Sequence, residues 1–451
     1  MPEQHLARNL KNRHIQLIAI GGAIGTGLFL GSGKAIHLSG PSILFAYLLI
    51  GMSLFFVMRA MGELLLSNSH YLSFTDFTTD YLGPWAGFVT GWTYWFCWIM
   101  TAMADLTAVG KYVRFWFDIP QWIPAFLCLL ILTVLNLMTV RMFGEIEFWF
   151  AIIKVVTIIA LIITGVLMLL VGFRTATGHV ALENIWIDGG LFPHGFSGFF
   201  LGFQMAFFSF VGVELVGVTA AEAADPQKTL PRAINSLPIR ILLFYIGALF
   251  VILCITPWDR LNPADSPFVR VFTIVGIPAA AGIINFVVLT SAASACNSGL
   301  FSTSRMLFSL GQEGDAPKPF ATLDRHHVPG VALLCSTFAL SIGVVLNYFL
   351  PDQVFTLVTS ISSICFIWVW SMILIAHLIY RKKRPKLAAA SHFKAPLAPA
   401  VNWIILVFFA FLLMMIGLAP DTRIALFVTP VWFLILLIAY SWRKRHATVG
   451  R

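Results

Sequence analysis

Charged residues are scarce in this sequence. Only 11% of its 451 residues are Asp, Glu, Lys or Arg, whereas 59% are hydrophobic. A soluble domain usually has about 25% charged and about 45–50% apolar residues. This composition excludes an ordinary globular domain, a disordered chain and a disulfide scaffold, so we interpret the chain as an integral membrane protein.

Motifs for metal, nucleotide or hydrolytic chemistry are also missing. The six cysteines show no CxxC spacing, the eleven histidines show no ligand spacing, and no Walker A, HExxH or GxSxG motif occurs. The cysteines all fall inside apolar runs, at Cys97, Cys128, Cys254, Cys296, Cys335 and Cys365. We therefore expect them to be packing residues, and we expect no metal, no other cofactor and no enzymatic activity.

Long apolar runs are the main feature that the sequence does have. A helix of roughly 20 residues crosses a bilayer core of roughly 30 Å. Twelve runs are long enough, namely 15–38, 41–66, 85–110, 122–140, 148–173, 196–219, 239–258, 276–304, 330–350, 354–380, 401–419 and 424–442. The polar, basic start of the chain leads directly into a full-length span, so we expect no cleavable signal peptide. These runs predict an all-α integral membrane protein with about twelve transmembrane helices.

The net charge of +9 follows the loops between these spans. If the N-terminus lies inside, twenty Lys and Arg residues fall in inner loops and tails and only seven fall in outer loops. The positive-inside rule then places both tails, 1–14 and 443–451, in the cytoplasm. The basic surplus is therefore interpreted as a topology signal, and no nucleic acid partner is expected.

The segment from Gly21 to Gly33, GGAIGTGLFLGSG, has six glycines in thirteen residues. One interpretation is close helix packing, because two pairs of these glycines have GxxxG spacing. The other is a span that is broken near Ile24 to Gly27. Backbone N–H and C=O groups freed at membrane depth are tolerated only beside a cavity or a ligand, where they suit a carboxylate and an ammonium group.

A second candidate break lies five spans later, in FFSFVGVELVG from Phe207 to Gly217. Gly212 and Gly217 flank Glu214 in this segment. An odd offset of five spans means that the second unit starts on the opposite side of the membrane, so spans 1–5 and 6–10 are candidates for inverted repeats. Paired interruptions in two halves point to a transporter binding site.

Ionisable residues inside predicted spans are few, and each is a candidate functional residue. Glu214 either joins the second break or is a paired packing acid. Lys154 in the fifth span either snorkels to the cytoplasmic interface or, if desolvated, carries a proton. Asp105 in the third span either lines the outer vestibule or pairs locally. Arg59 and Glu63, four residues apart, are interpreted as an ion pair within one helix.

Several stretches carry a family resemblance over essentially the whole chain. They include NRHIQLIAIGGAIGTGLFLGSG, GPSILFAYLLIG, MRAMGELL, GPWAGFVTGWTYW, FGEIEFWFAIIKV, ELVGVTAAEAADPQKTLPRAIN and NFVVLTSAASACNSGLFSTSRMLF. With them the chain resembles the amino acid permeases of the amino acid–polyamine–organocation (APC) superfamily, bacterial amino acid transporter branch. Through SGFFLGFQMAFFSFVGVELVG, TPW, SPFV and VTPVWF it is most similar to members that carry D-serine, D-alanine and glycine. Sister permeases for threonine, proline, asparagine and aromatic amino acids share much of this sequence.

The resemblance implies a LeuT-like fold, which consists of two inverted repeats of five helices with the first and sixth helices broken. The implied first repeat is 15–173, the second is 196–380, and two extra helices occupy 399–442. The resemblance also implies a multi-pass protein of the bacterial cytoplasmic (inner) membrane.

The resemblance further implies a binding site at the two breaks. The substrate carboxylate would meet the backbone N–H groups of Gly25, Thr26 and Gly27, helped by the Thr26 hydroxyl. The ammonium group would meet carbonyls near Ala23, Phe208 and Val211. Further implied roles are an aromatic gate for Phe208, coupling and gating for Glu214, proton coupling for Lys154, and pocket-wall positions for Asp105, Ser294 and Asn297.

We therefore expect a secondary active transporter that imports a small neutral amino acid with a proton by alternating access. Its partners would be the amino acid, protons and the lipid bilayer. Two alternatives remain open, namely an amino acid exchanger or a permease for another neutral L-amino acid, and a non-transporting amino acid sensor. A sensor usually carries a signalling domain, and the tails here are only about 14 and 9 residues long, so we expect transport.

Overall fold

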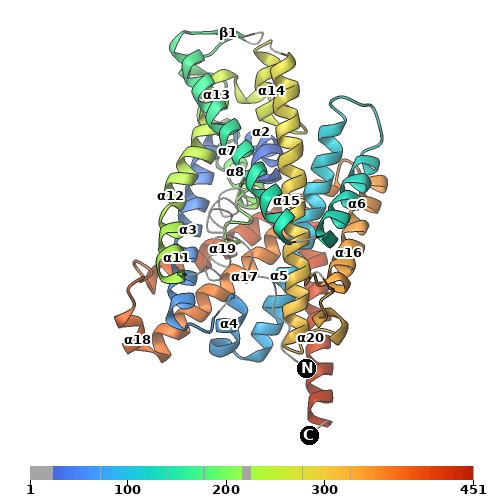
Figure 1. Ribbon diagram of the computed structural model, residues 1–451. Coiled ribbons are helices and arrows are strands. Elements are labelled where there is room, and N and C mark those ends of the chain that lie inside the picture. The colour runs from blue at the N-terminus through green and yellow to red at the C-terminus, as the bar shows by residue number, and fades with distance from the viewer. Residues whose placement is uncertain are drawn as a thin grey trace.

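The computed structural model describes residues 24–71, 73–138, 140–175, 178–215, 225–276, 278–325 and 327–449. Ala23 and Gly217, two residues of the predicted breaks, lie outside these ranges. Figure 1 shows helices that mostly run along one long axis, with the β1 hairpin at one end and α4, α18 and the end of α20 at the other.

The first part of the chain forms η1 (Gly27–Gly31), α2 (Ser32–Ser39), η2 (Gly40–Ser42), α3 (Ile43–Ser67), α4 (Phe74–Leu82), α5 (Pro84–Val113), α6 (Trp122–Met138) and α7 (Val140–Leu170). The antiparallel hairpin of β1 (Arg174–Thr175) and β2 (Gly178–His179) follows, then η3 (Leu182–Ile185), α8 (Gly195–Leu201) and α9 (Phe203–Phe208).

The second part forms α11 (Pro226–Asn235), α12 (Leu237–Arg240), η4 (Ile241–Gly247), α13 (Ala248–Ile255), η5 (Trp258–Arg260), α14 (Pro267–Ile274) and α15 (Pro278–Gln312). It continues with η6 (Lys318–Ala321), α16 (Gly330–Phe349), α17 (Val354–Lys383), α18 (Pro385–Ala390), α19 (Ala400–Leu418) and α20 (Ile424–Val449). Helices α15 and α17 both pack against α5 in the middle of the bundle.

Eight helical stretches in the described part of the chain are long and apolar enough to cross a membrane. One of them, Gly27–Ser67, contains residues 27–38 of the first predicted span and the whole of the second. Helix α5 is not among the eight, although its 30 residues are long enough, because it is rich in Trp, Tyr, Thr and Gly. Most of α5 is buried by other helices, so its sequence does not need to be strongly apolar.

The backbone departs from regular α-helix from Gly27 to Gly31 and again after Phe208. The first described helical turns, from Gly27 to Gly31, form a short π-helix that continues into α2. Helix α9 ends at Phe208, and turns follow up to Glu214. Gly212 lies in these turns with φ of +98°, a conformation that costs glycine far less than any residue with a side chain. The α-helix is therefore interrupted between Phe208 and Leu215, inside the second predicted break.

Candidate functional site

The segment that begins at Gly27 and the interrupted segment after α9 meet in direct backbone contact at Gly27. A β-carbon on Gly27 would lie 2.5 Å from Ser209 Cα and 3.0 Å from the Phe208 carbonyl oxygen. One turn later, a β-carbon on Gly31 would lie 2.8 Å from Met205 Sδ. The contacts of Gly27 and Gly31 therefore agree with the interpretation of GGAIGTGLFLGSG as a segment of close helix packing.

Thr26, next to this backbone contact, contacts the third predicted span. Its hydroxyl donates a hydrogen bond of 2.7 Å to Asp105 Oδ1 on α5, and both residues are buried. Asp105 Oδ2 has no hydrogen-bond partner among the described residues. The local pairing considered for Asp105 is therefore replaced by a contact with a residue 79 positions away.

Lys154 is buried in the interior of α7, with 1% of its surface exposed. Its ammonium group interacts electrostatically with Asp105 and with Glu147. A lysine that snorkels would expose its charged end at the surface of the molecule. The burial of Lys154 instead supports the interpretation of an internal lysine near Thr26 and Asp105.

Glu147 is a site residue that the sequence analysis missed. It is fully buried, and Ser294 on α15 donates its hydroxyl to both Glu147 carboxylate oxygens, at 2.8 and 2.9 Å. The available signal was spacing, because residues seven apart lie on the same face of a helix. Glu147 precedes Lys154 by seven positions, which places both on one face of α7.

Two of the residues predicted for the pocket wall, Ser294 and Asn297, hydrogen-bond to other buried side chains. Asn297 accepts a hydrogen bond of 2.7 Å from Asn136 on α6, and Ser294 contacts Glu147, so both side chains bond to the first half of the chain. The residue of α15 that lies closest to a β-carbon built on Gly25 is Ala295, at 3.9 Å. Helix α15 therefore lies next to Gly25, through a residue that the prediction did not include.

Glu214 folds back on the second interrupted segment. One carboxylate oxygen accepts a hydrogen bond of 3.2 Å from the Gly212 N–H, and the other accepts one of 3.2 Å from the Tyr94 hydroxyl on α5. The side chain is fully buried. Glu214 thus ties the turn after α9 to α5, an arrangement that suits both a gating acid and a paired packing acid.

An aromatic pair lies next to the Gly27 contact. Phe208, at the end of α9, is buried and packs edge-to-face on Phe355 of α17, with ring centroids 6.3 Å apart. The Lys111 ammonium group lies 5.8 Å from the Phe355 ring centroid, within the range of a cation–π contact. Val211 is also buried. Phe355, which the sequence analysis did not single out, is therefore the direct partner of the predicted gate residue.

The predicted ion pair of Arg59 with Glu63 is wrong. Glu63 is fully buried and pairs with His377 at 3.0 Å and Arg381 at 3.1 Å on α17, and it accepts a hydrogen bond of 2.6 Å from the Ala395 N–H. The Arg59 guanidinium group instead donates to Asn235 Oδ1 and to the Lys394 carbonyl. Arg59 and Glu63 therefore hydrogen-bond to residues distant in the sequence and not to each other.

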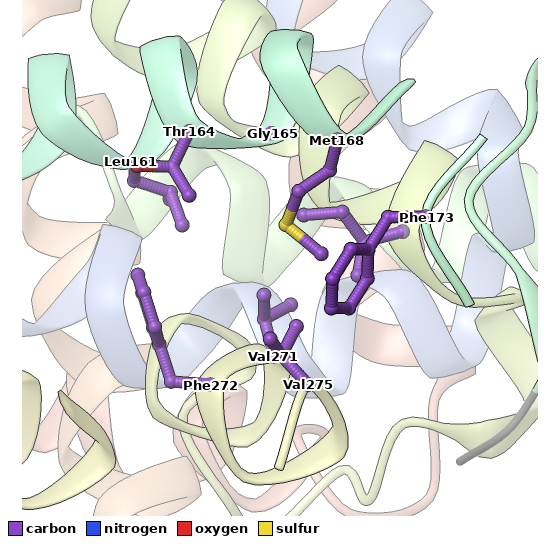
Figure 2. A pocket seen from close by; sticks show the side chains of 9 residues that line it. Leu161, Thr164, Gly165, Met168, Phe173, Val271, Phe272 and Val275 are labelled. Atoms are coloured by element: carbon purple, nitrogen blue, oxygen red, sulfur yellow. The ribbon is translucent and has the colours of Figure 1, made fainter. Parts of the chain in front are cut away.

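A cavity of about 130 Å³ lies away from these residues, between α7, α13 and α14. Figure 2 shows Met168 and Phe173 pointing toward Val271 and Val275. It is lined by Leu161, Thr164, Gly165, Met168, Phe173, Ile255, Val271, Phe272 and Val275. A zwitterion needs polar groups for both of its charges, so this almost wholly apolar cavity does not suit an amino acid.

Metal-binding clusters are absent from the described residues, where no three His, Cys, Asp or Glu side chains are placed to hold an ion. All six cysteines are free thiols located in helices. Cys97, Cys254, Cys296 and Cys365 are buried among apolar residues, as expected for packing residues.

Comparison with known proteins identifies related sequences over nearly the full length. A family model described as amino acid permease matches residues 14–449. The amino-acid permease AapA of Bacillus subtilis is 61% identical over 98% of this chain and 96% of its own length. The D-serine/D-alanine/glycine transporter of Escherichia coli K12 is 58% identical over 100% of this chain and 97% of its own. The aromatic amino acid transport protein AroP of Escherichia coli is 42% identical over 98% of this chain and 97% of its own.

Proposed function

Because this chain belongs to the amino acid permease family, we propose that it imports small neutral amino acids together with protons, by alternating access. Its substrates would be D-alanine, D-serine and glycine, as the printed name of the 58% identical relative suggests. The observation that carries the proposal is the backbone contact of Gly27 with the interrupted helix at Phe208 and Ser209, next to the buried Thr26, Asp105 and Lys154.

The architecture that we propose has twelve membrane spans, ten of which form two inverted repeats, 15–173 and 196–380, followed by two further spans in 399–442. Both tails would lie in the cytoplasm of a bacterium, with the chain in the inner membrane. The basic ends of α17 and α20 support this orientation, since they lie at the same end of the bundle as α18 (Figure 1). Basic residues favour the cytoplasmic side of a membrane protein.

The proposed substrate site uses backbone groups at the two breaks. The carboxylate would bind the N–H groups of Gly25, Thr26 and Gly27, and the ammonium group would bind carbonyls near Ala23, Phe208 and Val211. Phe208, covered by Phe355, would close the site toward the outside. These buried rings and the backbone contact at Gly27 leave little space between the two segments, which favours a small substrate side chain.

The proposed energy source is a proton that crosses with the substrate. Moving one elementary charge down a membrane potential releases about 2.3 kcal/mol per 100 mV. One proton for each neutral zwitterion would therefore support roughly fifty-fold accumulation at that voltage. We place Lys154 in the proton pathway because its buried cation interacts with Asp105, which itself contacts Thr26.

The first prediction concerns uptake of labelled D-alanine into proteoliposomes that contain no internal amino acid. We expect the wild type to accumulate D-alanine when an inward proton gradient is imposed, and Lys154→Ala to lose this accumulation while it still binds D-alanine. Lys318→Ala is the matched control, because Lys318 lies exposed in η6 and should leave uptake unchanged.

Four results would contradict the proposal or a part of it. Wild-type uptake only after the vesicles are preloaded with amino acids would identify an exchanger. Gradient-driven uptake of an aromatic or other L-amino acid, with no uptake of D-alanine, would identify a different permease specificity. Binding of D-alanine without uptake or exchange would favour a sensor. Gradient-driven uptake by Lys154→Ala at the wild-type level would remove Lys154 from the proton pathway.

The second prediction is that Glu214→Gln slows transport by about tenfold, with a weaker effect on D-alanine affinity. Glutamine keeps one carbonyl oxygen, but its amide N–H₂ would face either the Tyr94 hydroxyl or the Gly212 N–H, both of which are donors in the native contact. Initial uptake rates over a range of pH measure the effect. Tyr94→Phe removes one of the two bonds and should give a smaller change in the same direction. Wild-type rates for Glu214→Gln at every pH would return Glu214 to a packing role.

A further inference from the structure

Thr26 has one hydroxyl proton and two candidate acceptors. In the structure that proton is donated to Asp105 Oδ1 at 2.7 Å, inside a buried contact. The proposed function assigns the same hydroxyl to the substrate carboxylate. A single O–H cannot make a full-strength hydrogen bond to both acceptors at once. Arrival of the substrate carboxylate therefore takes a hydrogen bond away from Asp105.

Asp105 has no second hydrogen bond among the described residues that would remain after this loss, because its other carboxylate oxygen has no partner there. The titratable groups that interact with it are Lys154 from α7, Tyr112 from its own helix, Cys128 from α6 and Cys296 from α15. Of these four, Lys154 is the one that carries a full positive charge when protonated. A buried carboxylate that loses its donor is costly to keep ionised.

We propose that Asp105 takes up the coupled proton when the substrate carboxylate displaces it from the hydroxyl of Thr26. This inference rests on the proposed symport and assigns to Asp105 a role beyond that of a pocket wall. The Thr26 O–H···Asp105 hydrogen bond is exchanged for Thr26 O–H···substrate, and a proton from the outer solution adds to the Asp105 carboxylate. On the inner side the substrate leaves, Thr26 donates to Asp105 again, and the proton is released to the cytoplasm.

The coupling is reciprocal by thermodynamic necessity. If substrate binding favours protonation of Asp105, then protonation of Asp105 strengthens substrate binding by the same factor. Where substrate binding takes up one full proton, the dissociation constant falls about tenfold for each unit decrease in pH. If Thr26 did not exchange this hydrogen bond, protonation of Asp105 would not be linked through Thr26 to binding of the substrate carboxylate.

The experiment is calorimetric binding of D-alanine to the purified full-length protein, in buffers that differ in their heat of ionisation. This measurement gives the number of protons taken up for each D-alanine bound. We expect about one proton for the wild type and for Thr26→Ser, which keeps the hydroxyl. We expect none for Asp105→Asn and none for Thr26→Val, a variant of nearly the same shape that has no donor. Lys154→Ala does not serve here, because it also changes the charge next to Asp105.

Two proteoliposome assays show whether Asp105→Asn still folds and binds. We expect this variant to exchange internal for external D-alanine and to lose gradient-driven accumulation. If Asp105→Asn is inactive in both assays, the inference is tested by comparing the proton uptake of Thr26→Val with that of Thr26→Ser. Neither of these variants changes Asp105.

The outcomes separate this inference from the proposed function. Normal proton uptake by Asp105→Asn or by Thr26→Val, in a protein whose wild type takes up a proton, overturns the inference and leaves the symport intact. A wild type that accumulates D-alanine in a proton gradient but takes up no proton on binding also overturns the inference alone. A wild type that fails both measurements overturns the symport itself.

Discussion

Gly27→Ala should abolish transport and lower the thermal stability of the protein. The added β-carbon would lie 2.5 Å from Ser209 Cα, 2.9 Å from Ser209 N and 3.0 Å from the Phe208 carbonyl oxygen. All three are backbone atoms, so no rotation of a side chain can relieve the contact. Two hydrogen bonds also restrict movement of Ser209. The Tyr47 hydroxyl is 2.8 Å from Ser209 Oγ, and the Tyr245 hydroxyl donates to the Ser209 carbonyl.

Overpacking of a tight core usually costs about 1–3 kcal/mol, and more where the backbone must move. We therefore expect D-alanine uptake by Gly27→Ala to fall by more than about tenfold, since displacing either segment moves the proposed carboxylate and ammonium sites apart. The measurements are initial uptake rates in proteoliposomes and the unfolding temperature of the purified variant.

Gly25→Ala is the matched control for this substitution. A β-carbon on Gly25 would lie 3.9 Å from the Ala295 β-carbon, an ordinary contact, and alanine keeps the backbone N–H that the proposed site uses. We expect Gly25→Ala to fold like the wild type. If Gly27→Ala matches the wild type in both uptake and stability, Gly27 does not lie as close to the Phe208 and Ser209 backbone as the structure places it.

Glu63→Ala should be among the most destabilising single substitutions in the chain. Glu63 is fully buried and is bonded to His377, Arg381 and the Ala395 N–H, which connects α3 to α17 and to the segment before α19. Removal of one partner from a buried ion pair typically costs about 3–5 kcal/mol, because the remaining charge is left uncompensated. We expect a lower unfolding temperature and less folded protein in the membrane.

Asp421→Asn provides the contrast for Glu63→Ala. Asp421 also forms an ion pair, with Lys34, but its side chain is 52% exposed. Exposed pairs contribute about 0–1 kcal/mol, so this variant should unfold close to the wild-type temperature. Equal unfolding temperatures for Glu63→Ala and Asp421→Asn would show that the Glu63 cluster does not stabilise the fold as a buried ion pair.

Local features of the chain were enough to predict the interruption near Gly212, but they left Lys154 open between the interface and the interior, and the structure places it in the interior. A glycine tolerates a positive φ that other residues avoid, and the residue itself is visible in the sequence. Glu147 was missed because it lies close to the end of a predicted span, where an acid is easily taken for an interfacial residue. Its spacing of seven from Lys154 was the available signal, and it is informative only once both residues are known to be buried.

Partners that are distant in the sequence were beyond prediction. Spacing suggested that Glu63 pairs with Arg59, yet Glu63 pairs with His377 and Arg381, more than 300 positions away. Thr26 and Asp105 were both predicted as site residues, but no pattern joined a residue of the first span to one of the third.

The sequence by itself determined the class of molecule, its apolar helices and the places where glycine permits the backbone to leave the helix. These properties depend on composition and on local conformational freedom, which every residue carries with it. The tertiary structure decided which groups share a proton or a charge, such as Thr26 with Asp105 and Ser294 with Glu147. A hydrogen bond requires two atoms within about 3 Å of each other, and only the packing of helices against one another brings such distant residues that close.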